Sequence, residues 1–488
     1  MFIKVLLLVI YVAMMVSIAA VTHKKAKNLN DFLLGGRKIG PWLSAFAYGT
    51  SYFSAVIFIG YAGKNGWNFG LSATWIGIGN AFVGALLPWL IMAKPARRMT
   101  QRLGADTMPE FFQRRYDSKF MKIASALIIF VFLVPYSASV YQGLGSLFEK
   151  VFGIPLIYVV LGMAAVTALY LVAGGYLATA YGDLIQGIIM LGGVGFMIFF
   201  LFKAMGGVSQ SINKLAEFGE GMADMFASGA ASPKDLISMV VLTSLGTWGL
   251  PQMVHKFYAI KDESAIKRGA VISTIFSLIV GGGAYLAGAF GRVVLNNQLP
   301  EATATTSSFD LIMPNVLFST MPDALLGLIA VLVLSASMST LASLVLTSAS
   351  TLSMDLFRDV LFPKMSQKNV MLLMRALCIV FVLCSIAITL SSNAGITTLM
   401  SLSWGTVAGT CLGPFLLGLI SKRTTKIGAI AGMLSGFITS LGLTAILGMA
   451  QTPFNGSCAM IASIAVTFIV SLLTPAPSKE KIAEVFGE

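Results

Sequence analysis

The chain has 488 residues, of which 57% are hydrophobic and only 11% are charged, against about a quarter charged in an ordinary soluble protein. So little charge could not cover the surface of a soluble protein of this size. Soluble enzymes, nucleic-acid readers and disordered scaffolds are therefore excluded, and the net charge of +13 needs an explanation from where the basic residues lie.

Apolar runs of about 20 residues, each long enough to cross a bilayer as a helix, recur along the chain. We predict thirteen spans, at residues 2–21, 41–63, 71–93, 120–147, 154–173, 183–206, 236–256, 269–292, 323–350, 370–391, 395–420, 427–449 and 457–474. The first run carries an early lysine, Lys4, and no small-residue cleavage site, so we expect a retained helix in place of a cleaved signal peptide.

Lys and Arg concentrate in alternate loops, which indicates the orientation in the membrane. With the N-terminus outside, 26 of the 33 basic residues lie in inward loops and five in outward loops. The inward loops are 24–38, 94–122, 256–268, 358–375, 422–426 and 479–481. We therefore expect a multi-pass protein of the cell membrane with a cytoplasmic C-terminus, and no nucleic-acid partner.

The sequence lacks a motif for nucleotide binding. No GxxxxGK[ST] segment is present, so ATP-driven pumping is disfavoured. Four cysteines lie in apolar stretches without a CxxC pair and are predicted to be packing residues. The outward segment 207–235 is long and mildly amphipathic, which is typical of a segment on the membrane surface.

Two spans are interrupted by glycine or proline at matching positions. Residues 45–63 contain Gly49 and Gly60, and residues 243–252 (TSLGTWGLPQ) end in a Gly-Leu-Pro sequence. These spans are five apart, as two repeats of five helices would give. Broken helices expose carbonyls that hold cations and amides that hold anionic groups. Glycine that merely allows close helix packing is the alternative for one such span; two at matching positions favour a binding site.

The ninth predicted span is rich in hydroxyl groups. Ser339, Ser343 and Thr347 are spaced by four residues and so share one helix face, with Thr340 beside them. Neutral hydroxyls together with backbone carbonyls suit Na⁺, whereas Ca²⁺ and Mg²⁺ call for carboxylates. Such hydroxyls also bond to their own helix or to neighbouring helices, and the stripe alone slightly favours that alternative.

One acidic residue, Asp183, heads the sixth predicted span in the sequence YGDLIQG. An acid at the membrane edge often caps a helix, but it could also relay a cation toward the cytoplasm. Both interpretations stay open from the sequence.

The segments DFLLGGRKIGPW (31–42) and GGYLATAYGDLIQG (174–187) carry a resemblance to a known family. The chain resembles the sodium/solute symporters, which include bacterial sodium/proline, sodium/pantothenate and sodium/sialic acid carriers and animal sodium/glucose carriers. The resemblance implies an all-α integral membrane protein of 13 transmembrane helices, with an inverted-repeat 5+5 (LeuT-type) core, one extra N-terminal helix and two extra C-terminal helices. The implied units are 1–30 (peripheral helix), 39–206 (first repeat), 207–235 (outer loop), 236–420 (second repeat) and 421–488 (two helices and a short cytoplasmic tail).

The same resemblance implies a sodium site. Its ligands are the carbonyls of Thr50, Phe53 and Ala336 and the hydroxyls of Ser339 and Thr340. Asp183 matches the family's inner-gate aspartate, and with Ser343 it could serve a second cation. Ala342 stands where members with two sodium ions have a serine, so we expect one Na⁺.

Solute contacts are implied for positions at the two broken spans and in the fourth span: Ser51, Tyr52, Ser54, Tyr136, Thr243, Thr247 and Trp248. Two of these, Thr243 and Thr247, replace a tryptophan and a tyrosine of the proline carriers. The Gly-Leu-Pro of residues 249–251 is closer to the pantothenate and monocarboxylate members. The identity of the solute is therefore open.

The expected function is sodium-coupled secondary active symport of a small organic solute, an amino acid or small carboxylate, into the cell by alternating access. No chemical bond need be made, so no enzyme activity is expected. The expected partners are the solute, Na⁺ and membrane lipid, with no obligatory protein partner. A proton-coupled carrier, pantothenate or monocarboxylate uptake, a channel and a sensor with the carrier fold remain alternatives.

Overall fold

The structure is a computed structural model that describes residues 2–23, 33–303 and 306–487. The side chains at 19, 23 and 168–175 are not among those described. Part of the first predicted inward loop, with the basic residues at 24–27, lies outside these ranges. Throughout the described residues the secondary structure is helical, apart from one isolated parallel bridge between Ile39 and Ile260.

The helices follow one another along the chain as α1 (Phe2–His23), η1 (Gly35–Arg37), α3 (Pro41–Tyr52), η2 (Val56–Tyr61), α4 (Ala62–Phe69), η3 (Gly70–Ala73), α5 (Thr74–Ala81), η4 (Phe82–Leu86), α6 (Leu87–Ile91), α7 (Ala93–Leu103), α8 (Met108–Tyr116), α9 (Lys119–Phe152), α10 (Leu156–Ala204) and α11 (Val208–Ala216). They continue as α12 (Pro233–Gly249), α13 (Pro251–Tyr258), α14 (Glu263–Ala289), α15 (Gly291–Val294), η5 (Ser308–Leu311), α16 (Ile312–Thr320), α17 (Asp323–Thr351), η6 (Leu352–Leu361), α18 (Gln367–Ser391), α19 (Ile396–Ile420), α20 (Lys426–Leu447), η7 (Met449–Gln451), α21 (Thr452–Leu473) and α22 (Lys479–Phe486).

Within the described residues, ten helices are long and apolar enough to cross a membrane, or eleven if α12 and α13 form one bent span. When the bent pair is counted as one span, the difference from the predicted thirteen arises in two places. The second and third predicted spans overlap one run, Val56–Ile91, and the fifth is represented by a short apolar segment, Leu156–Thr167. The all-helical membrane class is therefore confirmed, while the count of thirteen stays a prediction.

Helix α10 differs from the sequence expectation. We predicted a loop between residues 173 and 183, but the helix continues through this stretch. Two adjacent glycines, Gly174 and Gly175, lower helix propensity without removing a backbone hydrogen bond, so they do not force an end. Asp183 consequently lies inside a helix, and the capping interpretation of this residue is wrong.

Helices α3 and α12 both end abruptly in the interior. The backbone turns extended at Phe53 (φ −105°, ψ 107°), and the helix resumes as the π-helix η2. Helix α12 ends at an extended Leu250, and α13 leaves at 45° to it. Pro251 favours this break because it cannot donate a backbone hydrogen bond and it disfavours a helical residue before it.

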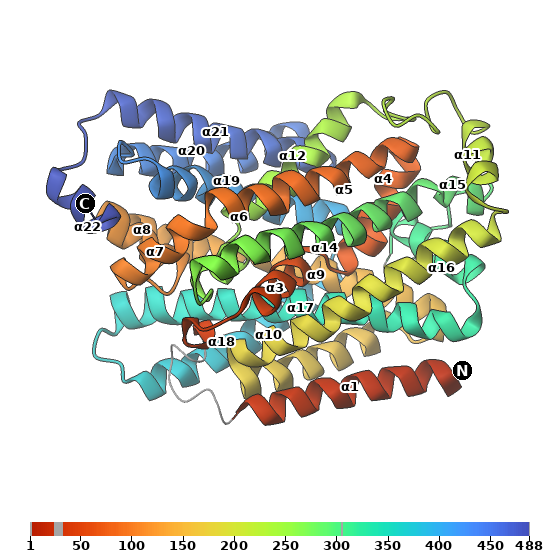
Figure 1. The fold of residues 1–488 in the computed structure, drawn as a ribbon, viewed down its shortest axis with the longest axis horizontal. Helices are drawn as coiled ribbons and strands as arrows, with labels where there is room; N and C mark the ends of the chain where they lie inside the picture. Colours follow the sequence, from red (N-terminus) through yellow and green to blue (C-terminus); the bar gives the residue numbers. More distant parts are fainter. Residues whose placement is uncertain (1, 24–32, 304–305, 488) are drawn as a thin grey trace.

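The long helices run side by side along the long axis of the molecule, and the termini lie at opposite ends (Figure 1). Helices α20 and α21 pack on α19 along one edge, while α1 lies along the opposite edge against α10 and α17. Helix α17 is almost wholly buried, in contact with α1, α9 and α10. Its hydroxyl groups therefore face protein on every side.

Candidate functional site

The break in α3 lies against the hydroxyl-rich part of α17. The Thr340 hydroxyl donates to the carbonyl oxygen of Thr50 at 3.3 Å, and Ser339 Oγ lies 2.8 Å from Thr50 Oγ1. The last carbonyls of a helix have no intrahelical partner, so the end of α3 presents oxygen atoms to α17. All three residues are buried.

Asp183 completes this oxygen cluster from α10. The Ser339 hydroxyl donates to Asp183 Oδ1 at 2.7 Å, and the Asp183 side chain is 1% exposed. Three elements distant in sequence thus contribute hydroxyl, carbonyl and carboxylate oxygens to one buried place. Burial of so many oxygen atoms costs free energy unless each has a hydrogen-bond or ionic partner. Hard oxygen ligands of low total charge are suited to a monovalent cation.

The other predicted sodium ligands lie next to this cluster. Phe53 is the extended residue that directly follows α3, and its N–H donates to Gly49 O at 3.1 Å. Ala336 is fully buried on α17, within one helical turn of Ser339 and Thr340.

A basic residue, Lys256, lies beside the cluster. Its Nζ donates to Ser343 Oγ at 3.0 Å and lies 3.7 Å from Asp183 Oδ2. Ser343 Oγ is in turn 2.9 Å from Ser51 Oγ on α3. The prediction that Lys256 lies in an inward loop is wrong, because this residue is buried in α13. A lysine at the end of an apolar span was the signal that could have identified it.

Four of the predicted solute contacts, besides Ser51, donate side-chain hydrogen bonds to protein groups. Thr243 Oγ1 donates to Asn80 Oδ1, Thr247 Oγ1 to Gly84 O and Trp248 Nε1 to Val83 O, each at 2.8 Å. The Tyr52 hydroxyl donates to Thr243 O at 2.7 Å. These donors therefore fasten α12 to α5 and η4 and to the end of α3.

The π-helix η4 supplies the backbone carbonyls that accept the hydrogen bonds from Thr247 and Trp248. A π-bulge shifts the backbone hydrogen-bond register, and such bulges often lie at functional sites. Gly84 O in η4 also accepts from the Tyr48 hydroxyl at 2.7 Å. A Cβ at Gly84 would lie 2.1 Å from the Tyr52 hydroxyl, so any other residue here would displace Tyr52.

The buried donors that have no hydrogen-bond partner among the described residues include the Tyr136 hydroxyl on α9 and Trp404 Nε1 on α19, which lie near the break. The Tyr136 hydroxyl faces Ser54, Thr340 and Trp404 without forming a hydrogen bond. The Trp404 ring stacks on Tyr52 at 6.0 Å and meets the Tyr136 ring edge-on at 5.8 Å. Unpaired buried donors are costly, so these two are suited to a polar ligand.

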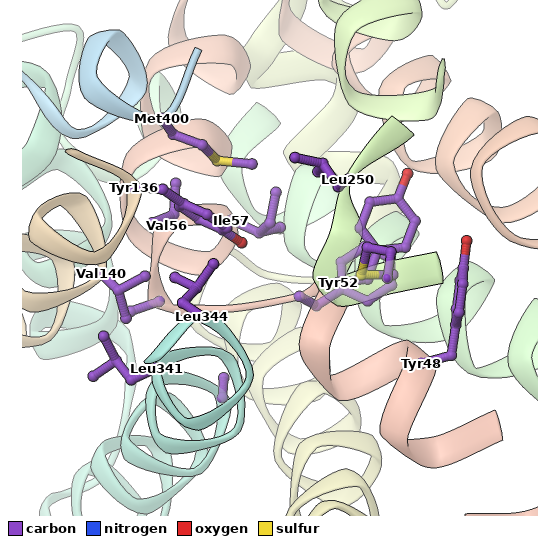
Figure 2. Close-up of a cluster of buried hydrophobic side chains, with 14 of the residues drawn as sticks. Tyr48, Tyr52, Val56, Ile57, Tyr136, Val140, Leu250, Leu341, Leu344 and Met400 are labelled. Carbon is purple, nitrogen blue, oxygen red and sulfur yellow. The ribbon is translucent and has the colours of Figure 1, made fainter. Parts of the chain in front are cut away.

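Apolar side chains form the rest of this region. In Figure 2, Tyr136 extends past Val56 and Ile57 on η2, near Leu344 on α17, with Leu250 and Tyr52 farther along. Such a mixture, apolar walls with a few convergent polar groups, is typical of small-molecule sites. Trp404 was not among the predicted solute contacts, although a tryptophan among small residues (SLSWGTVAG) indicates such a position.

The GGR sequence of residues 35–37 lies at the other end of α3. Arg37 donates to Ala105 O at 2.9 Å and to Asp106 Oδ1 at 3.0 Å, and it also reaches Tyr258 O at the end of α13 at 3.3 Å. Burial raises the pKa of Asp106, and the Arg37 charge opposes that shift. This motif thus ties α13 to the segment between α7 and α8.

Comparison with known proteins identifies the class to which this fold and site belong. The family model described as the sodium:solute symporter family matches residues 32–436. The chain belongs to this family. It is therefore a multi-pass membrane transporter and not an enzyme, and Na⁺ is the co-transported ion, as the sequence resemblance predicted.

The chain is 31% identical to the osmoregulated proline transporter OpuE of Bacillus subtilis over 479 residues, 96% of this chain and 94% of that protein. It is 29% identical to the high-affinity proline transporter PutP of the same organism, over 95% and 97% of the two chains. Among solved structures it is similar in fold to a Na⁺-coupled sialic acid symporter (TM-score 0.82, 18% identity, 98% and 99% of the chains) and more distantly to a nucleobase-cation-symport-1 transporter (TM-score 0.52, 13% identity, 93% and 98%).

Proposed function

We propose that the protein takes up proline together with one Na⁺ by alternating access. The observation that carries the proposal is the buried oxygen cluster at the break in α3, where Thr50, Ser339 and Thr340 meet. We assign Na⁺ to this cluster, with the carbonyls of Phe53 and Ala336 as its further ligands. Asp183 holds Ser339 in place and supplies negative charge nearby.

Proline is favoured as solute by two considerations. Relatives that are named as proline transporters align over almost the full length of the chain. The region beside the break also fits a small zwitterion with an apolar ring, because the unpaired donors of Tyr136 and Trp404 can bind a carboxylate. The rings of Tyr52 and Trp404 can cover the apolar part of such a solute.

Coupling follows from where the two ligands would bind. Na⁺ between α3 and α17 fixes the end of the broken helix, and the solute binds on the other side of the same break. A ligand shifts a conformational equilibrium only through its different affinity for the two states. Na⁺ must therefore favour the outward, solute-ready state, and the pair of ligands would then face inward by rocking of the core against the scaffold.

The orientation belongs to the same proposal. The end of the molecule with the C-terminus also carries α7, α8 and α22, while the end with the N-terminus carries α11, α15 and α16 (Figure 1). The basic inward loops 94–122 and 479–481 thus gather at the C-terminal end, which supports a cytoplasmic C-terminus.

The test is uptake of radiolabelled proline into proteoliposomes with an inward Na⁺ gradient, compared with choline at equal ionic strength. We expect uptake only with Na⁺, and competition by excess unlabelled proline but not by pantothenate or pyruvate. Uptake driven equally well by a proton gradient in Na⁺-free buffer would overturn the assignment of Na⁺ as the coupling ion. Competition by pantothenate or pyruvate, but not by proline, would overturn the assignment of proline as the solute.

A further inference from the structure

One charged group in the membrane interior has no part in the function proposed above. Lys256 is 3% exposed and lies in the last turn of α13, the second half of a broken span, where a free ammonium would be strongly destabilising. Its Nζ contacts two side chains from other helices, Asp183 on α10 and Ser343 on α17, and Ser343 in turn lies against Ser51 on α3.

These three side chains are the kind of oxygen ligands that a monovalent cation takes. Asp183 uses Oδ1 to accept from Ser339, and its buried Oδ2 has no hydrogen-bond partner in the described structure. That atom faces the ammonium at 3.7 Å. The ring of Tyr176, on the same helix as Asp183, lies 5.3 Å from Nζ and adds a further weakly negative surface.

We propose that the Lys256 ammonium is a tethered cation that occupies a second cation position, made by Asp183, Ser343 and Ser51, and so limits the protein to one exchangeable Na⁺. A buried carboxylate needs a positive partner, and removal of one partner of a buried pair leaves an uncompensated charge. Lys256 meets that need permanently, whereas a free ion at the same place would be carried across with the solute. The inference rests on the proposed Na⁺ site at Thr50.

Lys256 also joins elements that alternating access must move. It lies on α13 and contacts Asp183 on α10 and Ser343 on α17. The ammonium therefore fills the second cation position in every conformational state in which these three helices stay packed together. This arrangement makes Lys256 a residue that sets the cation to solute ratio, without contact with the solute.

The experiment counts radioactive Na⁺ bound per purified protein in detergent at saturating Na⁺, without solute. We expect one Na⁺ for the unmodified protein and two for Lys256→Met, because the uncovered Asp183 carboxylate and hydroxyls attract the ion. Lys256→Arg keeps the charge and should bind one. Lys261→Met, which removes a half-exposed lysine nearby, is the matched control and should also bind one.

The outcomes separate this inference from the proposed function. Absence of bound Na⁺ in the unmodified protein would overturn the proposed Na⁺ site at Thr50, and the proposed role of Lys256 would fall with it. One Na⁺ in both the unmodified protein and Lys256→Met would overturn only the role of Lys256. Should Lys256→Met be unstable after extraction, NaCl but not choline chloride at equal ionic strength should restore its thermal stability; equal rescue by both salts, or by neither, would overturn the inference.

Discussion

At the scale of single residues, hydroxyl groups on one buried helix have different partners. Ser337 donates to Val333 O of its own helix at 2.7 Å, whereas Ser339 and Thr340, two and three residues later, reach α3 and α10. Spacing along the helix indicates which hydroxyls share a face, but the partner depends on what covers that face. Ser337 is therefore a matched control for the proposed ligands.

The double substitution Ser339→Ala with Thr340→Ala should raise the Na⁺ concentration for half-maximal uptake by at least about tenfold. A hydrogen bond to a charged group contributes roughly 1.5 to 3 kcal/mol, and each 1.4 kcal/mol is about a factor of ten in affinity. The measurement is the Na⁺ dependence of uptake in proteoliposomes. Ser337→Ala should leave it unchanged, and an unaltered Na⁺ dependence in the double variant would rule out these ligands.

Trp404→Phe should raise the proline concentration for half-maximal uptake by about fivefold to tenfold, because it removes one hydrogen-bond donor, worth about 1 to 1.5 kcal/mol, and keeps an aromatic ring. Half-saturation by Na⁺, measured in parallel at saturating proline, should not change. Trp248→Phe is the comparison, since its indole N–H is already bonded to Val83 O. Trp248→Phe should lose thermal stability with little effect on proline affinity. Loss of proline affinity in Trp248→Phe but not in Trp404→Phe would contradict the assignment of Trp404 as a solute contact.

At the scale of elements, irregular backbone determines the site more than regular helix does. The extended residues at the ends of α3 and α12 and the π-helices η2 and η4 free carbonyls that side chains or ligands then use. Interrupted spans were expected from glycine and proline. The π-helix at Phe82–Leu86 was not, because it carries no such residue pattern beyond Gly84.

A buried carboxylate joins two further elements near the N-terminal end of the molecule. Asp310 in η5 accepts from the backbone N–H of Ile396, the first residue of α19, at 3.1 Å, and from the Ser307 hydroxyl at 2.8 Å. Burial raises the pKa of Asp310, although the bonds from Ile396 and Ser307 and the charge of Lys64 oppose the shift.

This raised pKa predicts a pH dependence. The folded protein binds the Asp310 proton more tightly than the unfolded chain does, so stability should fall as the pH rises from the ordinary carboxyl range, about 4, through the raised value. Asp310→Asn keeps an oxygen acceptor for Ile396 and removes the titration. The midpoint of thermal unfolding in detergent should therefore fall less between about pH 4 and about pH 7 in this variant; parallel pH profiles would contradict the prediction.

At the scale of the whole molecule, the distribution of basic residues predicts the orientation in the membrane. The basic helices α7, α8 and α22 lie at the end of the molecule that carries the C-terminus (Figure 1), whereas Lys256 is buried in the interior. From the sequence, Lys256 was predicted to lie in a loop because it follows directly after an apolar span and precedes a basic segment. Only the packing of α13 against α10 and α17 shows that its ammonium is buried.

The coupled cycle sets a limit on accumulation. For one Na⁺ per neutral solute, a membrane potential of ~100 mV contributes about 2.3 kcal/mol and a tenfold Na⁺ gradient about 1.4 kcal/mol. Together they support roughly 500-fold accumulation of proline if coupling is tight. The steady-state ratio of internal to external proline in proteoliposomes at fixed gradients measures this limit. A ratio far above it would require a second Na⁺ in the cycle.

The sequence by itself determined the class of protein, because hydrophobicity, loop charge and interrupted spans follow from local composition and the two quoted motifs carry the family resemblance. It also predicted that the hydroxyl groups of α17 and the end of α3 belong to a binding site. The tertiary structure decided which of these groups meet, that Thr243 and Thr247 are already bonded, and that Trp404 and Lys256 lie beside the break. The physical reason is that periodicity defines the faces of one helix, whereas the partners of a buried polar group depend on how separate helices pack around it.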